Sequence, residues 1–326
     1  MAKKLHCYQM KNNVFVIFFV TSFLAITAQT KTPLMFRLQD KHAKKHIKKY
    51  VHHDTLITTS NATLHFSYNI DNSKPYLLML HGIGVNARTN WYNQIEPLSK
   101  DFNLILPDLI YFGESTSSSQ NMSIEFQVQQ IHEAIIKLRI TEKLNVMGFS
   151  YGGLTAAMYN ELYQTEINKL IIIDGPVKFY SEKIADSLAC KVGVKSMGNV
   201  IVPQTPEEFD AMQKAVMSSS FHVSKRLKRK IIKYYFSPTK TIRHKQLDYL
   251  TDHQNTYQTL NYNLDKTPTL LIWGGLDGVV PPSVGINLNK TFPTTTKLII
   301  YPTAKHDAHF SQTKALNEAV VDFIKD

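Results

Sequence analysis

The stretch Val146-Met147-Gly148-Phe149-Ser150-Tyr151-Gly152-Gly153 carries a serine inside a Gly-x-Ser-x-Gly pattern. Mostly apolar residues 144–147 lead into it, as in a buried strand, and residues 154–162 are rich in helix formers. A strand, a tight turn with a serine and a helix are the context that a nucleophile elbow requires. The flanking glycines let the strand and the helix approach closely. A glycine-rich turn with an incidental serine explains the same residues, so the remaining sequence has to decide.

Apolar runs and helical patterns alternate along most of the 326 residues. Buried strands are predicted at residues 76–80, 102–106, 169–173, 269–273 and 297–301, and a hairpin at residues 55–59 and 63–68. Helices are predicted at residues 90–99, 123–138, 283–288 and 313–324, and Ser123 is a candidate N-cap. The alternation predicts the α/β class, with a mostly parallel central β-sheet flanked by helices.

Residues 177–265 interrupt this alternation. They contain no clear buried strand, and helical patterns are found at residues 181–189, 206–218, 224–236 and 241–250. We therefore expect a core formed by residues 51–176 and 266–326, with residues 177–265 as an inserted helical cap that covers the site and sets its specificity.

A polar residue follows each predicted central strand. These residues are His81, Asp108, Ser150, Asp174, Asp277 and His306. Parallel sheets bind ligands beyond the carboxyl ends of their strands. We expect these side chains to gather at one edge of the sheet, where the serine of the opening motif would also lie.

Together these features resemble the α/β-hydrolase superfamily, and most closely its cap-bearing, serine esterase-like and lipase-like branch. The resemblance covers residues 60–326. It rests on the His81-Gly82 turn, the loop 108–115, the elbow at Ser150 and the late pair Asp277 and His306. The fold implied is the one that the strand and helix patterns already predict.

The resemblance also implies the roles of particular residues. The superfamily shows its triad in the order serine, acid, histidine, which assigns Ser150 as nucleophile, Asp277 as orienting acid and His306 as base. A serine hydroxyl needs such a base to become nucleophilic. The backbone N–H groups of Ile83 and Tyr151 are the implied oxyanion hole, which stabilises negative charge in the transition state.

Two positions of this triad have rivals in the sequence. Asp174 follows an earlier strand, and some members of the superfamily carry their acid there. His309 competes with His306, because the glycine that usually precedes the histidine is Lys305 in this chain. We prefer Asp277 for its Trp-Gly-Gly-Leu-Asp loop and His306 for its position soon after the last strand.

The neighbouring residues have less specific expectations. His81 is expected to shape the oxyanion turn, Asp108 to fix its own loop and Asp307 to be solvated. Four aromatic residues are expected either to line the substrate pocket or to belong to the core. They are Trp91, Tyr111, Phe112 and Tyr151.

These residues predict an exported serine hydrolase that cleaves carboxylic esters through an acyl-enzyme intermediate. The alternatives are a carbon–carbon bond hydrolase or amidase with the same triad, or a non-catalytic ligand-binding protein on this scaffold. Serine at the elbow argues against dehalogenases and epoxide hydrolases of this fold, which use aspartate.

No metal-ligand cluster or nucleotide-binding loop is evident, so no cofactor is expected. The expected substrate is a small-molecule or lipid-like ester, and the sequence does not indicate an oligomeric state.

The first 28 residues are typical of a secretory signal segment. Lys3, Lys4 and Lys11 precede an apolar run at residues 14–28. Cleavage after Thr27 fits the small-residue preference better than cleavage after Ala28. An uncleaved membrane anchor is the alternative, although the run is short for a span of about 20 residues. We expect export to a periplasmic or extracellular location, with residues 29–50 as a basic lead-in.

The formal net charge is +11, and removal of residues 1–28 takes away three lysines and no acidic residue, which leaves +8. Basic residues concentrate at residues 31–49 and 225–233. We interpret these runs as solvated surface and a flexible lead-in; a weak association with a membrane surface stays open. No nucleic-acid motif accompanies them, so no nucleic-acid partner is expected.

Cys190 is the sole cysteine beyond the signal segment, which excludes an intramolecular disulfide in the mature chain.

Overall fold

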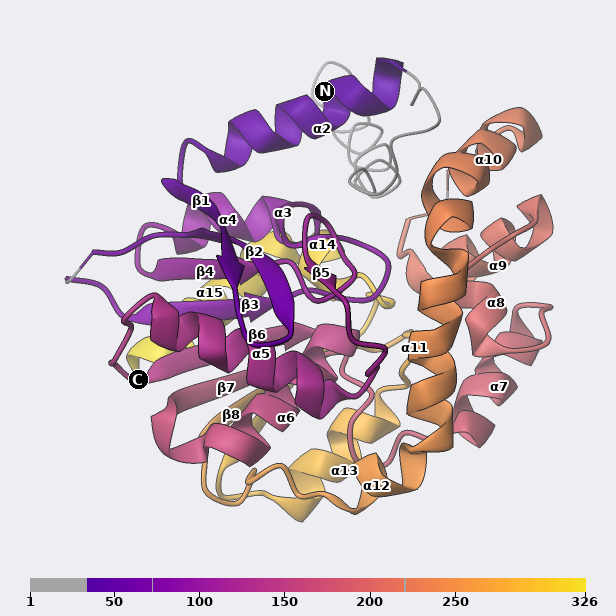
Figure 1. Ribbon diagram of the computed structural model, residues 1–326. Helices are drawn as coiled ribbons and strands as arrows, with labels where there is room; N and C mark the ends of the chain where they lie inside the picture. The colour runs from indigo at the N-terminus through magenta and orange to yellow at the C-terminus, as the bar shows by residue number, and fades with distance from the viewer. Residues whose placement is uncertain (1–33, 72, 220) are drawn as a thin grey trace, which may run out of the picture.

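A computed structural model describes residues 34–71, 73–219 and 221–326 (Figure 1). A nine-stranded sheet runs in the order β1-β2-β4-β3-β6-β7-β8-β9, and β5 pairs with β2. The strands are β1 His53–Thr58, β2 Ala62–Tyr68, β3 Tyr76–Leu80, β4 Asn103–Pro107, β5 Thr116–Ser117, β6 Leu144–Phe149, β7 Ile167–Ile173, β8 Thr269–Gly274 and β9 Thr296–Tyr301. Pairing is antiparallel around β2 and parallel from β4 to β9. The predicted strands, hairpin and fold class are confirmed.

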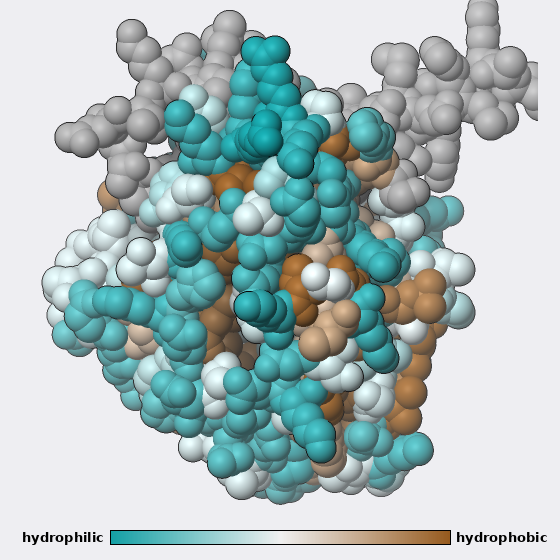
Figure 2. Space-filling view, turned by 90° about the vertical axis from the view of Figure 1, so that its right-hand side faces the viewer, coloured by the Kyte–Doolittle hydropathy of each residue, from teal (hydrophilic) through white to brown (hydrophobic). Residues whose placement is uncertain are grey.

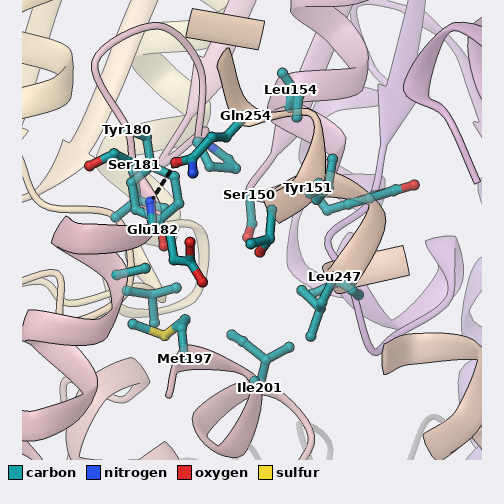
Figure 3. Close-up of a pocket in the computed structure, with 18 of the residues that line it drawn as sticks. Ser150, Tyr151, Leu154, Tyr180, Ser181, Glu182, Met197, Ile201, Leu247 and Gln254 are labelled. Carbon is teal, nitrogen blue, oxygen red and sulfur yellow. Dashed lines mark hydrogen bonds between the residues drawn. The ribbon is translucent and has the colours of Figure 1, made fainter. Parts of the chain in front are cut away.

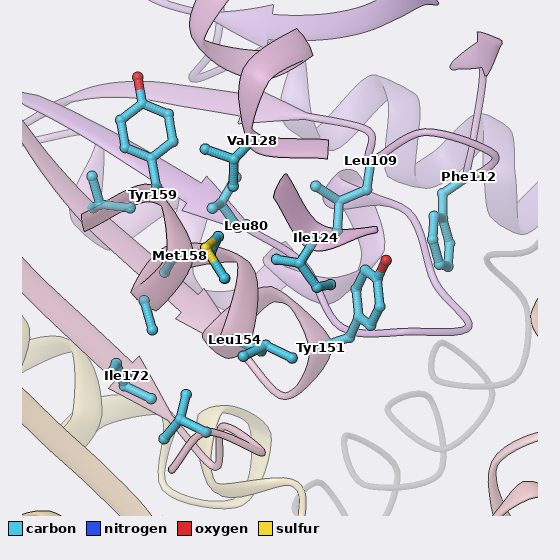
Figure 4. Close-up of a cluster of buried hydrophobic side chains, with 14 of the residues drawn as sticks. Leu80, Leu109, Phe112, Ile124, Val128, Tyr151, Leu154, Met158, Tyr159 and Ile172 are labelled. Carbon is cyan, nitrogen blue, oxygen red and sulfur yellow. The ribbon is translucent and has the colours of Figure 1, made fainter. Parts of the chain in front are cut away.

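The central strands are buried because helices cover both faces of the sheet. Successive side chains of β3 alternate between two hydrophobic clusters: Leu78 and Leu80 join one, and Leu77 and Met79 join the other. Figure 4 shows part of the first cluster, where Leu80 lies near side chains of α5 and α6. A continuous apolar run is therefore what this sheet position requires.

The helices of the two covering layers largely match the predicted ones. They are α3 Ala87–Asn90, α4 Tyr92–Leu98, α5 Ile124–Lys137, α6 Tyr151–Tyr163, α13 Ser283–Thr291, α14 Ala308–Ser311 and α15 Thr313–Lys325. Ser123 caps α5 by accepting a hydrogen bond of 3.1 Å from the N–H of Phe126, as predicted. The segment predicted as one helix at residues 90–99 begins earlier, because Asn86 caps α3, and it is divided at Trp91.

Six further helices lie between β7 and β8, beside the carboxyl edge of the sheet (Figure 1). They are α7 Glu182–Lys191, α8 Met197–Ile201, α9 Pro206–Val216, α10 Lys225–Ile231, α11 Lys240–Asp252 and α12 Gln254–Thr259. A π-helical turn at Ile232–Phe236 follows α10. The short α8 and α12 were not predicted, since a helix of five or six residues shows little periodicity. Apolar residues of α8 and α12 belong to the hydrophobic cluster that also contains residues of α5 and α6.

The expectation of a flexible lead-in is wrong for residues 34–47, which form the helix α2 Leu34–Ile47. Ala43 and Ile47 are one turn apart and buried. The ring of His46 stacks on that of Tyr92 in α4, with centroids 4.2 Å apart. Packing on α4 therefore orders a basic segment in which Lys41 and Lys45 remain exposed and Lys44 pairs with Glu114 at 3.4 Å. The expected signal, residues 1–28, lies outside the described residues. No helix among the described residues is long and apolar enough to cross a bilayer.

Asp108 fixes the loop after β4, as predicted. Its carboxylate accepts hydrogen bonds from the N–H groups of Ala87 (2.9 Å) and Glu114 (3.1 Å), and His65 Nδ1 lies 3.0 Å away. A Cβ at Gly113, where φ is +54°, would lie 1.9 Å from this carboxylate, so only glycine fits. Burial raises the pKa of Asp108, but the contacts with His65 and the charge of Arg88 outweigh it and lower the pKa to about 2.

Ile47→Ala is expected to lower the free energy of unfolding by roughly 2 kcal/mol or more, because it removes a buried side chain between α2 and α4. Urea unfolding measures the change. Lys48→Ala, at the exposed neighbouring position, is the matched control and should stay within about 0.5 kcal/mol of the wild type. Equal effects of the two variants would contradict the docking of α2.

Asp108→Asn is expected to show a pH-dependent loss of stability. The folded pKa of Asp108, about 2, lies below the ordinary aspartate pKa of 3.8. The ionised carboxylate therefore stabilises the fold fully above pH 4, and this contribution is lost as the pH falls towards 2. The difference in unfolding free energy between wild type and variant should shrink by about 2 kcal/mol over this range. Urea titrations at several pH values measure it. The difference for Glu318→Gln, an exposed carboxylate, should stay flat.

Candidate active site

Ser150 occupies a strained turn between β6 and α6. Its φ and ψ are +53° and −120°, a combination that L-residues rarely adopt. A Cβ at Gly148 would lie 1.9 Å from the carbonyl oxygen of Gly152, and one at Gly152 would lie 2.1 Å from that of Leu80. The strand, turn and helix predicted from the sequence are confirmed, and the two glycines are required by close backbone approach.

A chain of hydrogen bonds joins Ser150, His306 and Asp277, all of them buried. Ser150 Oγ lies 2.8 Å from His306 Nε2, and His306 Nδ1 lies 2.7 Å from Asp277 Oδ2. A carboxylate accepts, so Nδ1 carries the proton and Nε2 is free to accept from the serine hydroxyl. The other oxygen of Asp277 accepts from the N–H groups of Val279 (2.7 Å) and Val280 (2.9 Å). These bonds hold the carboxylate in one orientation.

The sheet brings these three residues together. Ser150 follows β6, Asp277 follows β8 and His306 follows β9, and these parallel strands end at one edge of the sheet. His81, Asp108 and Asp174 end β3, β4 and β7 at the same edge. The expected gathering of polar residues there is confirmed.

The rival base His309 does not occupy the position next to Ser150. It is fully buried, and its ring lies 4.0 Å from that of Phe149 and 5.8 Å from that of Trp91. Burial lowers its pKa well below the usual value. Its place is in the apolar layer beneath the site.

The expectation that Asp307 is solvated is wrong. It is 5% exposed, and it accepts hydrogen bonds from the backbone N–H (2.9 Å) and the hydroxyl of Ser218. Ser218 Oγ in turn accepts from the N–H of Lys305 at 2.8 Å. The segment after α9 is thereby tied to the loop that carries His306, a contact between distant residues that no sequence pattern signals.

The rival acid Asp174 is close to the triad without a hydrogen bond to His306. One of its oxygens accepts from the N–H of Gly274 at 2.8 Å. Asp174, Asp277 and His306 offer metal-type ligand atoms within 4.8 Å of one another, a single such group among the described residues. Both ring nitrogens of His306 are already hydrogen bonded to Asp277 and Ser150, which fits a proton relay better than a metal centre.

The two predicted oxyanion donors face the same cavity as Ser150. Ile83 and Tyr151 both line it, and Tyr151 is the first residue of α6, where backbone N–H groups have no partner within the helix. Among the described residues, neither N–H donates to a protein acceptor. They are therefore available to a bound oxygen atom.

His81 holds the turn that carries Ile83. Its Nδ1–H donates to the carbonyl oxygen of Gly82 at 2.8 Å, and its Nε2 accepts from the N–H of Leu109 at 2.9 Å. Asn90 accepts from the N–H of Gly82 at 3.1 Å. Burial lowers the pKa of His81 to about 4, so the ring is neutral near pH 7. His81 has the structural role that was predicted.

Two cavities meet at Ser150. The larger, about 260 Å³, extends between α7, α8, α11 and α12, and the smaller, about 70 Å³, reaches towards Val85 and Phe149. Ile83 and Ile201 line both. In Figure 3, Ser150 lies among the side chains that line the larger cavity, and the N–H of Glu182 donates to the side chain of Gln254 at 2.8 Å.

The lining of the larger cavity combines apolar side chains with three carboxylates. Its carboxylates are Glu182, Asp186 and Asp248, on α7 and α11. Figure 2 views the side on which these helices lie, and its surface is largely hydrophilic, with apolar side chains gathered in a few places between. The cavity therefore suits a ligand with an apolar body and a polar end.

Of the four aromatic residues considered for the pocket, Tyr151 lines it. Trp91 and Phe112 are fully buried core residues, and Phe112 is covered by the guanidinium of Arg243, 3.3 Å from its ring centroid. Sequence reasoning missed the cavity residues Tyr180, Met197 and Leu247. An apolar residue that faces a cavity shows the same helical period as one that faces the core, so the sequence offers no signal for them.

Comparisons with known proteins agree with the fold. A family model described as "alpha/beta hydrolase fold" matches residues 75–189. The chain is 24% identical over 286 residues to monoacylglycerol lipase ABHD6 of Homo sapiens, covering 85% of this chain and 81% of the relative. It is 26% identical over 254 residues to Lipase 1 of Psychrobacter immobilis, covering 76% and 75%.

Among solved structures, a putative lipase from Acinetobacter baumannii superposes with a TM-score of 0.75 at 17% identity, over 92% of this chain and 98% of that one. This likeness concerns the fold. The doubly covered parallel sheet, the strained serine turn and the family model matched over residues 75–189 lead to one conclusion: the chain has the α/β-hydrolase fold.

Proposed function

We propose that this hydrolase cleaves carboxylic esters by an acyl-enzyme mechanism. The observation that carries the proposal is the continuous hydrogen-bond chain from Ser150 through His306 to Asp277. The names of its relatives, a monoacylglycerol lipase and a lipase, favour esters over amides and carbon–carbon bonds. A protein that only binds a ligand has no need of all three groups in this order.

In the first half of the reaction, His306 Nε2 takes the proton of Ser150 Oγ as the oxygen attacks the ester carbonyl carbon. The tetrahedral intermediate places its negative oxygen between the N–H groups of Ile83 and Tyr151. Its collapse breaks the bond to the alcohol, which leaves with the proton from His306. The acyl group stays on Ser150.

In the second half, water takes the place of the alcohol. His306 removes a proton from the water as its oxygen attacks the acyl carbon, and then returns the proton to Ser150 Oγ. Asp277 stays ionised throughout and stabilises the imidazolium. Free acid is released, and the starting state is restored.

The substrate we propose is an ester of an apolar acyl chain with an uncharged alcohol. The apolar part of the larger cavity accepts the chain, and the helices α7 to α12 act as a cap over it. The carboxylates Glu182, Asp186 and Asp248, which line this cavity, disfavour an anionic head group in it. The basic N-terminal segment with its apolar run supports an exported or membrane-anchored enzyme.

Ser150→Ala is expected to abolish the activity, because it removes the nucleophile. Hydrolysis of p-nitrophenyl esters and labelling by a fluorophosphonate probe measure it, and kcat/KM should fall by about 10⁴-fold or more. Ser283→Ala, at an exposed position at the start of α13, is the matched control and should behave as wild type. Hydrolysis that is unchanged in Ser150→Ala would refute the serine-hydrolase mechanism.

The triple variant Glu182→Gln, Asp186→Asn, Asp248→Asn is expected to lose selectivity for uncharged head groups. The wild type should prefer oleoylglycerol over its 3-phosphate, which has the same acyl chain. Because a charge pair near a surface contributes roughly 1 kcal/mol or more, the ratio of kcat/KM values should fall by about tenfold in the triple variant. Glu142→Gln with Glu318→Gln, outside the cavity, is the control. An equal ratio in all three proteins would refute the role of these carboxylates.

A further inference from the structure

Asp174 is a fully buried carboxyl group that the proposed mechanism does not use. It follows β7, the strand between β6 and β8, and its φ of +49° lies in the left-handed region. Its backbone N–H donates to the carbonyl oxygen of Ile272 at 3.0 Å. Because such a backbone is strained, it persists only where the surroundings enforce it. The fold therefore holds this carboxyl group at a fixed place beside the triad.

The distances place Asp174 within reach of His306. An oxygen of Asp174, an oxygen of Asp277 and a ring nitrogen of His306 lie within 4.8 Å of one another. One Asp174 oxygen accepts from Gly274, whereas Oδ2 is buried and accepts no hydrogen bond among the described residues. Asp277 is a side-chain hydrogen-bond partner of Asp174, so a proton on Asp174 is donated to Asp277. Once Asp174 is ionised, Oδ2 can accept a hydrogen bond instead.

The two carboxyl groups differ in how well a negative charge is supported. Asp277 accepts three hydrogen bonds, from His306, Val279 and Val280, while Asp174 accepts one, from Gly274. Burial and the nearby charge of Asp277 raise the pKa of Asp174 well above its usual value. Two buried carboxylates this close do not both ionise. The charge therefore resides on Asp277, and Asp174 keeps its proton.

We propose that Asp174 is a reserve acid of the triad, protonated while Asp277 is ionised and able to support His306 when Asp277 carries no charge. On removal of the Asp277 charge, Asp174 releases its proton to solvent, and its carboxylate accepts the hydrogen bond from His306 Nδ1–H. Asp174 is a positioning residue, since it acts through His306. This inference rests on the proposed serine-hydrolase function.

Four proteins test the proposal: wild type, Asp174→Asn, Asp277→Asn and the double variant. Asparagine retains an oxygen that accepts from Gly274, so Asp174→Asn is conservative. In other triads, loss of the acid's charge lowers kcat by about 10⁴-fold. We expect Asp277→Asn to lose roughly 10²-fold or less, Asp174→Asn to stay close to wild type, and the double variant to reach the full 10⁴-fold loss.

A merely structural role predicts a different pattern. Asp174→Asn would then lower kcat/KM by the same factor in the wild-type and Asp277→Asn backgrounds, and Asp277→Asn alone would show the full loss. That result would overturn the proposal. Thermal unfolding of all four proteins separates misfolding from a change in the triad.

The pH dependence gives a second readout. In Asp277→Asn, the remaining titratable groups that face Asp174 are His306 and Asp307. Activity of this variant should rise with pH as Asp174 loses its proton, and the double variant should lack this rise. The low-field proton NMR signal of His306 Nδ1–H should likewise persist in Asp277→Asn at high pH and vanish in the double variant. Its absence from Asp277→Asn would count against Asp174 as acceptor.

These readouts separate the two proposals. If the wild type hydrolyses no ester in a Ser150-dependent manner, the proposed function fails. The NMR signal then still decides whether Asp174 can take the place of Asp277 beside His306. If the wild type is active and the four proteins follow the structural pattern, the reserve acid alone fails.

Discussion

The strained turn at Ser150 is the constraint on which the site depends. The backbone of a serine is held at a positive φ so that its hydroxyl leaves the end of β6 and meets His306 at 2.8 Å. This is possible because Gly148 and Gly152 leave room for the strand and the helix α6 to pass within contact distance. The same turn leaves the N–H of Tyr151 without a helical partner, beside the Ser150 hydroxyl. One local geometry thus places this hydroxyl and a backbone N–H next to each other.

The segment at the end of α9 is hydrogen bonded to the loops that carry Asp277 and His306. The carbonyl oxygen of Ala215 accepts from the N–H of Gly278, next to Asp277. Ser218 bridges Asp307 and the N–H of Lys305, on either side of His306. A displacement of α9 would therefore move Asp277 and His306 as well. In this chain, the position of α9 and the hydrogen-bond chain from Ser150 to Asp277 are coupled.

Two buried charged groups near the site, Asp108 and Arg243, have different kinds of partner. Asp108 is ionised because His65 and Arg88 surround it, and it orders the loop that supports His81. Arg243 has no carboxylate partner among the described residues; it donates to Gln246 (2.6 Å) and to the carbonyl oxygen of Tyr111 (2.7 Å), and it lies over an aromatic ring. Burial lowers its pKa to about 9. The paired charges organise the core loops, and this arginine joins α11 to them.

The sequence by itself determined the strands, the fold class and the elbow, because these depend on local periodicity and on glycine at fixed spacing. It also named both acids and both histidines that compete for the triad, since each follows a strand of the sheet. Only the tertiary structure shows which of these side chains meet: His309 packs under Phe149, whereas His306 is hydrogen bonded to Ser150 and Asp277. Contacts between distant residues likewise determine that α2 packs on the core, that Asp307 is buried and which residues line the cavity. Local sequence patterns do not indicate such contacts, because these residues become neighbours only when the chain is folded.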